Sequence, residues 1–164
     1  MKYVVTGGAG FIGSNLVDKL IEEGNEVIIF DNLSSGFEQN INPKASFYNI
    51  DISNTNNNVH MMSLMQGAHT VFHLAAMARV QPSIDDPVKF EINNSLATVN
   101  MLKCSVDAKV KRFVYSASSS AYGNANKMPL RENDKTNPIS PYATQKYYGE
   151  IVCSMFAQVY EIET

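Results

Sequence analysis

The sequence predicts an α/β domain in which a doubly wound parallel sheet carries helices on both faces. Short apolar segments rich in β-branched residues alternate with longer segments of helical period along the chain. Several short segments, such as VV, VIIF and FVY, are continuously apolar, as in strands buried on two sides. Strands separated by helices form βαβ units, which build parallel sheets covered on both faces.

The first half of the chain contains three expected strands and two expected helices. Residues 2–6 (KYVVT) form a short β-branched strand. Residues 11–24 (FIGSNLVDKLIEEG) have apolar side chains at helical spacing and end on a glycine stop. Residues 26–30 (EVIIF) and 45–50 (ASFYNI) are expected to be the second and third strands, with the turn-rich DNLSSG after the second. Residues 54–67 have a helical pattern that is weak at its Asn-rich start.

The second half continues the alternation. Residues 69–76 (HTVFHLAA) and 112–118 (RFVYSAS) are expected to be the fourth and fifth strands. Residues 86–108 are expected to form one long helix, and residues 141–160 the last helix. The apolar positions that predict the long helix recur every three or four residues: Val88, Ile92, Leu96, Val99, Leu102 and Val106.

Composition limits the classes of function. The 164 residues suffice for one domain with a sizeable core, and 45% hydrophobic with 18% charged residues is ordinary for a soluble protein. The net charge of −3 gives no reason to expect nucleic acid or an anionic membrane as partner. No apolar segment is long enough to span a membrane, and the N-terminus lacks the pattern of a secretory signal. Cys104 and Cys153 have no metal-ligand spacing, which favours reduced thiols, a cytoplasmic location and no metal.

A glycine loop between the first strand and the first helix is the strongest local motif. TGGAGFIG places Gly7, Gly10 and Gly13 three residues apart, and Asp31 ends the second strand. This context is that of a dinucleotide fingerprint: a tight turn at Gly7, close approach of a pyrophosphate at Gly10, and helix packing at Gly13. Asp31 would accept hydrogen bonds from the adenosine ribose and repel a 2′-phosphate, which favours NAD over NADP. The alternative is a glycine turn with only a structural role.

Five motifs in order then suggest a family. The glycine loop, DNLSSG, FHLAA, YSASSSAYG and PYATQK closely resemble the extended short-chain dehydrogenase/reductase family, and within it the nucleotide-sugar epimerases of the UDP-glucose 4-epimerase type. The resemblance covers essentially the whole chain and implies a Rossmann-like fold. One departure is that NSLAT has Ala97 where the family pattern Asn-Val-x-Gly-Thr has glycine, which suggests a slightly wider helix–sheet contact.

The resemblance also implies site residues. The family's Tyr-x-x-x-Lys motif falls on Tyr142 and Lys146, and its catalytic Ser/Thr, four residues before the Tyr of the YG pair, falls on Ser118. These three are the expected catalytic residues. The expected NAD-binding residues are Gly7, Gly10, Phe11, Ile12, Gly13, Asp31, Asn32, Ser34, Ser35, Gly36, Asp51, Ile52, Leu74, Ala75, Ala76, Ala78, Asn93, Ser116, Tyr142 and Lys146.

The spacing of Tyr142 and Lys146 fits proton transfer, because residues i and i+4 share one face of a helix. A free tyrosine has a pKa of about 10, so a phenolate near neutral pH needs a shift of roughly 3 units, or about 4 kcal/mol. An exposed ion pair supplies about 1 kcal/mol or less. A lysine in a partly enclosed cleft, together with the positive nicotinamide, is expected to supply the rest. The phenolate would take a proton from a sugar hydroxyl that Ser118 holds, while a hydride passes to NAD.

Each of these residues also has a structural interpretation. Tyr142 could be one aromatic among several, Lys146 a solvated lysine, and Ser118 part of a strand-end loop. His73 is expected to be a hydrogen-bonded core histidine rather than a catalyst. Arg79 has two equal interpretations, a contact to a substrate phosphate or a surface position.

The resemblance favours epimerisation over dehydration. Related dehydratases carry acidic residues just after the catalytic Ser/Thr, where this chain has Ser119 and Ser120. Related epimerases continue beyond the Tyr-Lys helix, so residues 1–164 are expected to be an NAD-binding Rossmann domain, incomplete at its C-terminal end and without the substrate domain. The expected partners are a UDP-sugar and a second copy that docks through helices 86–108 and 141–160. Two alternatives stay open: an NAD-binding module without turnover of its own, and a nucleotide-sugar dehydrogenase or reductase.

Overall fold

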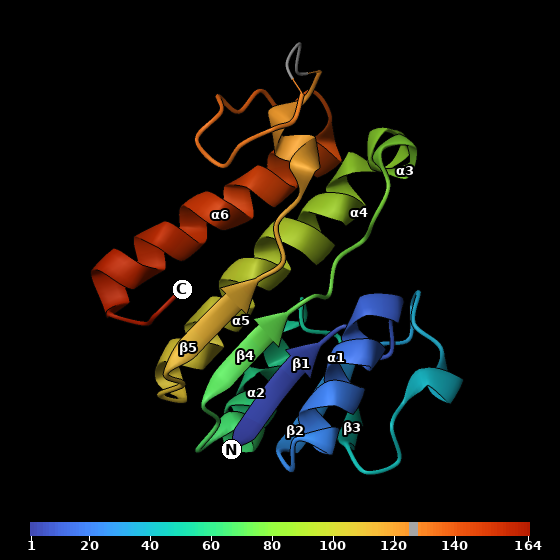
Figure 1. Ribbon diagram of the computed structural model, residues 1–164, viewed down its shortest axis with the longest axis vertical. Coiled ribbons are helices and arrows are strands. Elements are labelled where there is room, and N and C mark those ends of the chain that lie inside the picture. Colours follow the sequence, from blue (N-terminus) through green and yellow to red (C-terminus); the bar gives the residue numbers. More distant parts are fainter. Residues whose placement is uncertain (125–127) are drawn as a thin grey trace.

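Five parallel strands form one sheet in the computed structural model, which describes residues 1–124 and 128–164. Their order across the sheet is β3-β2-β1-β4-β5, so the order reverses between β1 and β4 (Figure 1). All carboxyl ends therefore meet along one edge, and the predicted parallel α/β fold is confirmed. The strands are β1 (Lys2–Thr6), β2 (Glu26–Asp31), β3 (Ser46–Asn49), β4 (Thr70–His73) and β5 (Arg112–Tyr115).

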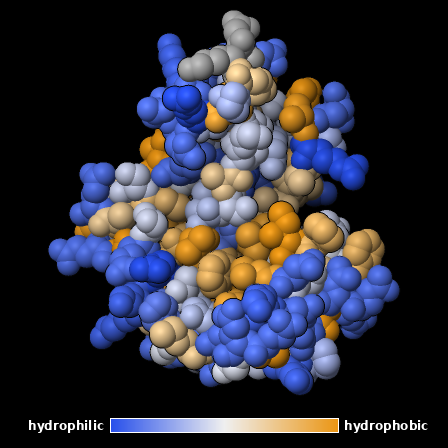
Figure 2. All heavy atoms as spheres, in the orientation of Figure 1, coloured by the Kyte–Doolittle hydropathy of each residue, from blue (hydrophilic) through white to orange (hydrophobic). Residues whose placement is uncertain are grey.

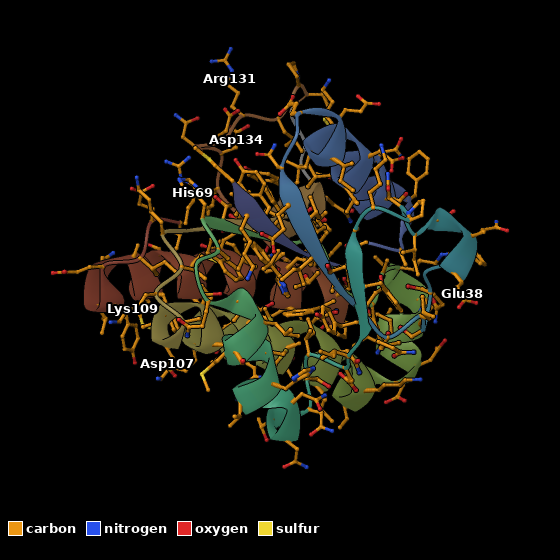
Figure 3. The ribbon with its side chains drawn as sticks, turned by 90° about the horizontal axis from the view of Figure 1, so that it is seen from below. Glu38, His69, Asp107, Lys109, Arg131 and Asp134 are labelled. Carbon is orange, nitrogen blue, oxygen red and sulfur yellow. The ribbon has the colours of Figure 1, made fainter. Side chains whose placement is uncertain are left out.

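Helices cover both faces of this sheet. Helix α1 packs on one face, and α2, α5 and α6 lie on the other (Figures 1 and 3). Figure 3 looks from the amino ends of the strands, with His69 and Lys109 in the turns before β4 and β5. In the described residues, no helix is both long and apolar enough to cross a membrane. The α-helices are α1 (Phe11–Glu22), α2 (Asn58–Met65), α3 (Val80–Asp85), α4 (Pro87–Glu91), α5 (Ala97–Asp107) and α6 (Pro141–Tyr160).

The core is divided by the sheet into two parts. Alternation along β1 sends Val5 toward α1, where it joins Val17 and Ile29. Val4 points to the opposite face and joins a larger cluster that includes Met101 and Phe156. Val4 and Val5 are both fully buried, so both faces of β1 are covered there, as expected for a central parallel strand.

Two predicted strands are longer than the observed ones. Residues 69–76 and 112–118 were expected to be strands, but β4 ends at His73 and β5 ends at Tyr115. Residues 74–76 and 116–118 instead leave the sheet at its carboxyl edge. This departure matters for function, because these residues then line the space above the sheet.

The predicted long helix over 86–108 is interrupted. Helix α4 runs into a π-helical turn, η3 (Ile92–Leu96), and then into α5. A π turn holds an extra residue, so the apolar face predicted by a regular period does not continue through it. Val88, Ile92 and Leu96, three of the positions whose spacing predicts the helix, are 69%, 44% and 46% exposed, so they do not belong to the core.

Candidate functional site

The candidate site lies at the carboxyl ends of the strands, where the order reverses between β1 and β4. Gly7 has φ +71°, and a Cβ there would lie 2.7 Å from the backbone nitrogen of Ala75. A Cβ on Gly13 would overlap the carbonyl oxygen of Gly7. The tight turn at Gly7 and the close packing at Gly13 are therefore as predicted. They bring the start of α1 to the edge of the crevice, where a helix N-terminus favours an anion.

Asp31 is held in a fixed orientation at the end of β2. Its carboxylate accepts hydrogen bonds from the backbone N–H of Ala9 at 3.0 Å and of Leu33 at 2.8 Å. Asp31 is buried, and it borders two adjoining pockets. A carboxylate has about four acceptor positions. The two backbone bonds therefore leave capacity for a ligand with paired hydroxyl groups.

The first pocket lies over β2 and the segment after β3. Asp51 borders this pocket. Its Oδ1 accepts hydrogen bonds from both the backbone N–H and the hydroxyl of Ser53. The other oxygen is left for a donor such as an exocyclic amine. The full lining is Gly7, Phe30, Asp31, Asn32, Ser34, Ser35, Ile50, Asp51, Ile52, Ala75, Ala76, Met77 and Asn93.

The second pocket follows the glycine loop toward β5. Phe11 and Ile12 begin α1 with side chains that are 85% and 64% exposed, so they do not join the core despite their helical spacing. Figure 2 shows a hydrophobic area where Figure 1 places the start of α1 and the segment after β4. The lining is Gly7, Gly10, Phe11, Ile12, Gly13, Asp31, Ser35, Gly36, Leu74, Ala75, Ala76 and Ser116.

These two linings contain most of the residues that the sequence predicts as cofactor-binding. Ala78, Tyr142 and Lys146 are the predicted residues outside both linings. Phe30, Ile50 and Met77 line the first pocket and were missed. The sequence could have indicated them by their position, because each directly precedes or follows a predicted site residue near the end of a strand.

A chain of buried hydrogen bonds fixes the segment after β4 from beneath. The Thr98 hydroxyl donates to the backbone carbonyl of Asn94 at 2.6 Å, so its oxygen accepts from His73 Nε2–H at 3.1 Å. His73 Nδ1 then accepts from the Thr6 hydroxyl at 2.9 Å, and that hydroxyl oxygen accepts from the backbone N–H of Ala75 at 3.2 Å. His73 is buried, and burial lowers its pKa to about 3. The prediction of a hydrogen-bonded core histidine is confirmed.

Asn94 fixes the same segment from the π turn. Its Oδ1 accepts from the backbone N–H of Met77 at 2.7 Å, and its Nδ2 donates to the carbonyl of Met77 at 3.1 Å. Nδ2 also donates to Oε1 of Gln145 in α6 at 3.0 Å. The irregular turn therefore aims one buried amide at both backbone groups of a residue that lines the site. Such π turns often occur at functional sites.

Tyr142 lies in the first turn of α6, whose start is strongly specified. Ser140 is the N-cap and accepts from the backbone N–H of Ala143 at 3.2 Å, and Pro141 occupies the first helical position. The backbone N–H of Tyr142 donates to the hydroxyl of Ser83 at 3.1 Å. Ser83 is fully buried in α3, a short helix that the sequence reasoning did not predict. Its role was therefore missed.

Lys146 is 5% exposed, so the interpretation as a solvated surface lysine is wrong. Burial lowers the pKa of its ammonium group to about 8, while the nearby Cys153 and Glu150 act in the opposite direction. Its Nζ lies 4.3 Å from the ring centre of Tyr115. At neutral pH the side chain remains mostly charged, which is a buried cation one helical turn from Tyr142.

Ser118 ends the segment after β5 and caps the short 3₁₀ turn η4 (Ser119–Tyr122), which packs on α6. Its hydroxyl lies 2.7 Å from that of Ser120 and accepts from the backbone N–H of Ser120 at 3.2 Å. Arg79 is exposed, with φ +85°, at the start of α3. Within residues 1–124 and 128–164, no group of three or more His, Cys, Asp or Glu side chains could hold a metal ion.

Comparison with known proteins agrees with this geometry. Residues 3–164 match the model of the NAD dependent epimerase/dehydratase family. The UDP-glucose 4-epimerase of Lactobacillus helveticus is 39% identical over 153 residues, which are 92% of this chain and 45% of that protein. The chain thus spans about half the length of the curated relatives it matches.

Solved structures give the same result. The UDP-glucose 4-epimerase of Thermotoga maritima, crystallised with UDP-glucose, superposes with a TM-score of 0.94 at 41% identity, covering 99% of this chain and 53% of that one. The UDP-glucose 4-epimerase of Thermus thermophilus, in complex with NAD, gives a TM-score of 0.91 at 32% identity, covering 99% of this chain and 52% of that one.

Proposed function

The chain belongs to the NAD dependent epimerase/dehydratase family, and we propose that residues 1–164 are the NAD-binding Rossmann domain of a UDP-glucose 4-epimerase-like enzyme. The proposed activity is a reversible hydride transfer at one sugar carbon of a UDP-sugar. One observation carries this proposal. The groove built by the glycine loop and Asp31 opens at the carboxyl edge of the sheet, the same edge where β5 leads to Ser118 and where α6 holds the buried Lys146.

The groove fits NAD by its own chemistry. A side chain on Gly13 would overlap the carbonyl oxygen of Gly7, so only a glycine allows α1 to begin this close to the loop, where its N-terminus would face a diphosphate. The oriented carboxylate of Asp31 suits the two hydroxyls of the adenosine ribose, and its charge disfavours a 2′-phosphate. Asp51 and Ile52 border the part of the pocket proposed for adenine. NAD is therefore the proposed cofactor, and no metal takes part in the proposal.

The catalytic roles follow from position and charge. When bound, the nicotinamide supplies a reversible hydride acceptor. The Tyr142 phenolate would accept the proton of the sugar hydroxyl, and the buried ammonium of Lys146 would stabilise that phenolate before the transfer. The Ser118 hydroxyl would hold the same sugar hydroxyl, with Ser120 as its partner. Ser119 and Ser120 in place of acidic residues support oxidation and reduction at one carbon rather than loss of water.

The experiment has two stages. Calorimetric titration of the purified chain with NAD tests binding, and a coupled assay tests interconversion of UDP-glucose and UDP-galactose. Tyr142→Phe should abolish turnover while NAD binding stays at the parent level, because it removes one hydroxyl and keeps the ring. Turnover retained by Tyr142→Phe would refute the catalytic role of Tyr142.

A second candidate function has one observation in its favour. The chain spans about half the length of its relatives, so NAD binding is tested separately from turnover, and the second candidate is an NAD-binding module without turnover of its own. Binding of NAD without interconversion supports the module. Net formation of NADH from a UDP-sugar would instead support a nucleotide-sugar dehydrogenase.

The proposed assembly is a homodimer through α4, η3, α5 and α6. These helices pack side by side (Figure 1). They present exposed apolar residues in two stripes. Leu96→Glu and Ile151→Glu should each convert a dimer to monomer in sedimentation velocity, whereas Val59→Glu, at a more exposed site on α2, should not. A monomeric parent would refute the dimer. The stripes contain Val88, Ile92 and Leu96 on one side and Tyr148, Ile151, Met155 and Val159 on the other.

The proposed location is the cytoplasm, with no nucleic acid or membrane as partner. The buried, unpaired thiols of Cys104 and Cys153 support it, because reducing compartments keep cysteines in this state.

A further inference from the structure

We propose that Tyr115 is a positioning residue whose ring face holds the Lys146 ammonium in place beside Tyr142. The inference rests on the proposed function for what Lys146 does, although its test needs neither NAD nor turnover. The starting observation is that Lys146 Nζ lies 4.3 Å from the centre of the Tyr115 ring. A cation over an aromatic face within about 6 Å is attracted by the ring quadrupole.

The ring contact supports a buried charge that has no ion pair among the described residues. Lys146 takes part in none of the salt bridges formed among residues 1–124 and 128–164. A buried ammonium without a paired carboxylate is costly, so any stabilising partner has a large effect on where the group rests. An aromatic face is a partner that leaves all three N–H donors free for a ligand.

The ring is held in register with the helix that carries Lys146. The Tyr115 hydroxyl donates to the backbone carbonyl of Lys146 at 3.3 Å. Gly149 lies beneath the ring, and a Cβ there would overlap Tyr115 Cζ and Oη. The glycine thus lets the phenol lie directly against α6. Ring and ammonium are fixed to the same turn of the helix, which makes their distance insensitive to small shifts between β5 and α6.

The ring is also supported within the sheet. His73 stacks with Tyr115 at 5.9 Å between centres and 22° between planes, and His73 contacts Phe113 in turn at 5.5 Å. Burial raises the pKa of Tyr115 well above its ordinary value, so Tyr115 stays a neutral phenol. It therefore cannot compete with Tyr142 as an acid or base, and its contribution to Lys146 is the face of its ring.

The titration of Lys146 depends on the other titratable groups that lie near it. Tyr142, Glu150 and Cys153 share α6 with it, Tyr115 lies on β5 and His73 on β4. We would label lysine with ¹³C at Cε and follow the Lys146 resonance by NMR over pH in the purified chain. This reports the ionisation of one side chain and is independent of cofactor and substrate.

Three variants separate the ring from the hydroxyl and from general core damage. Tyr115→Leu removes the aromatic face and should lower the Lys146 pKa by roughly one unit, since a buried cation–π contact is worth that much. Tyr115→Phe keeps the face and should restore the parent value to within a few tenths of a unit. Phe113→Leu removes a buried ring on the same strand that also contacts His73 but does not lie over Lys146, and it should titrate like the parent.

A fourth variant covers the case in which Tyr115→Leu does not fold. Gly149→Ala displaces the ring without changing it and should shift the Lys146 pKa downward as Tyr115→Leu does. The proposal is overturned if the variant that loses or displaces the ring titrates like the parent, or if Tyr115→Phe or Phe113→Leu shifts as far. Failure of NAD binding or turnover would leave these titrations unchanged, so the two proposals fail separately.

Discussion

Replacing His73 by Gln should make the stability of the chain less sensitive to acid. Burial lowers the pKa of His73 from 6.5 to about 3, and the ring holds its Nε2–H tautomer between two threonine hydroxyls. Protonation at Nδ1 would point a second donor at Thr6, whose oxygen already accepts from Ala75 and whose own proton would then lose its acceptor. The fold therefore excludes the charged form.

The sign and size follow from proton linkage. Between about pH 3 and 6.5 the unfolded chain binds a proton at residue 73 that the folded chain does not. Stability is therefore complete above pH 6.5 and is lost as the pH falls, by about 1.4 kcal/mol per unit. From about pH 7.5 to about pH 4.5 the loss assigned to His73 is about 3 kcal/mol, a large fraction of a typical domain's stability.

Urea unfolding followed by circular dichroism at both pH values measures this loss. His73→Gln should be less stable than the parent at neutral pH, because it loses ring packing, but about 3 kcal/mol of its acid loss should disappear. His60→Gln, on the exposed surface of α2, is the matched control and should keep the loss of the parent. If His73→Gln loses as much stability as the parent between the two pH values, the assignment to His73 is wrong.

Three further predictions test the loop, the helix start and cofactor choice. Gly13→Ala should lower the free energy of unfolding by about 3 kcal/mol, because the new Cβ overlaps the Gly7 carbonyl, and an unchanged urea midpoint would contradict the packing described. Ser83→Ala should cost about 1–2 kcal/mol, since the part-buried N–H of Tyr142 loses its acceptor, whereas Ser83→Thr keeps a hydroxyl and should cost less in the same measurement. Asp31→Ser should raise the affinity for NADP relative to NAD in calorimetry, and an unchanged preference would remove Asp31 from the proposed discrimination.

The strands and the glycine loop were predictable because their signals are local. A central strand such as β1 is apolar on both faces, so Val4 and Val5 mark it without knowledge of its neighbours. The loop carries its own constraints, since Gly7 and Gly13 have no room for side chains. Asp31 follows from the same logic, as the last residue of the strand next to β1.

The supports of the site were not predictable, because they depend on contacts between distant segments. Asn94 acts through a π turn that regular helical spacing does not reveal, and it clamps Met77 in another segment. Ser83 reaches Tyr142 across fifty-nine positions of sequence. The exposed positions of α4 and η3, such as Val88, satisfy the same spacing rule as core residues. Helical spacing of apolar residues shows that one face of a helix is apolar, but it does not show whether the core or a partner covers that face.

The backbone from Ala75 to Met77 is tied at both ends, to Thr6 of β1 and to Asn94 of the π turn. Because this segment is already ordered before a ligand binds, binding would cost little conformational entropy there. A molecule too wide for the groove would have to break bonds to two separate layers at once. A wall fixed in this way would therefore disfavour ligands wider than the groove.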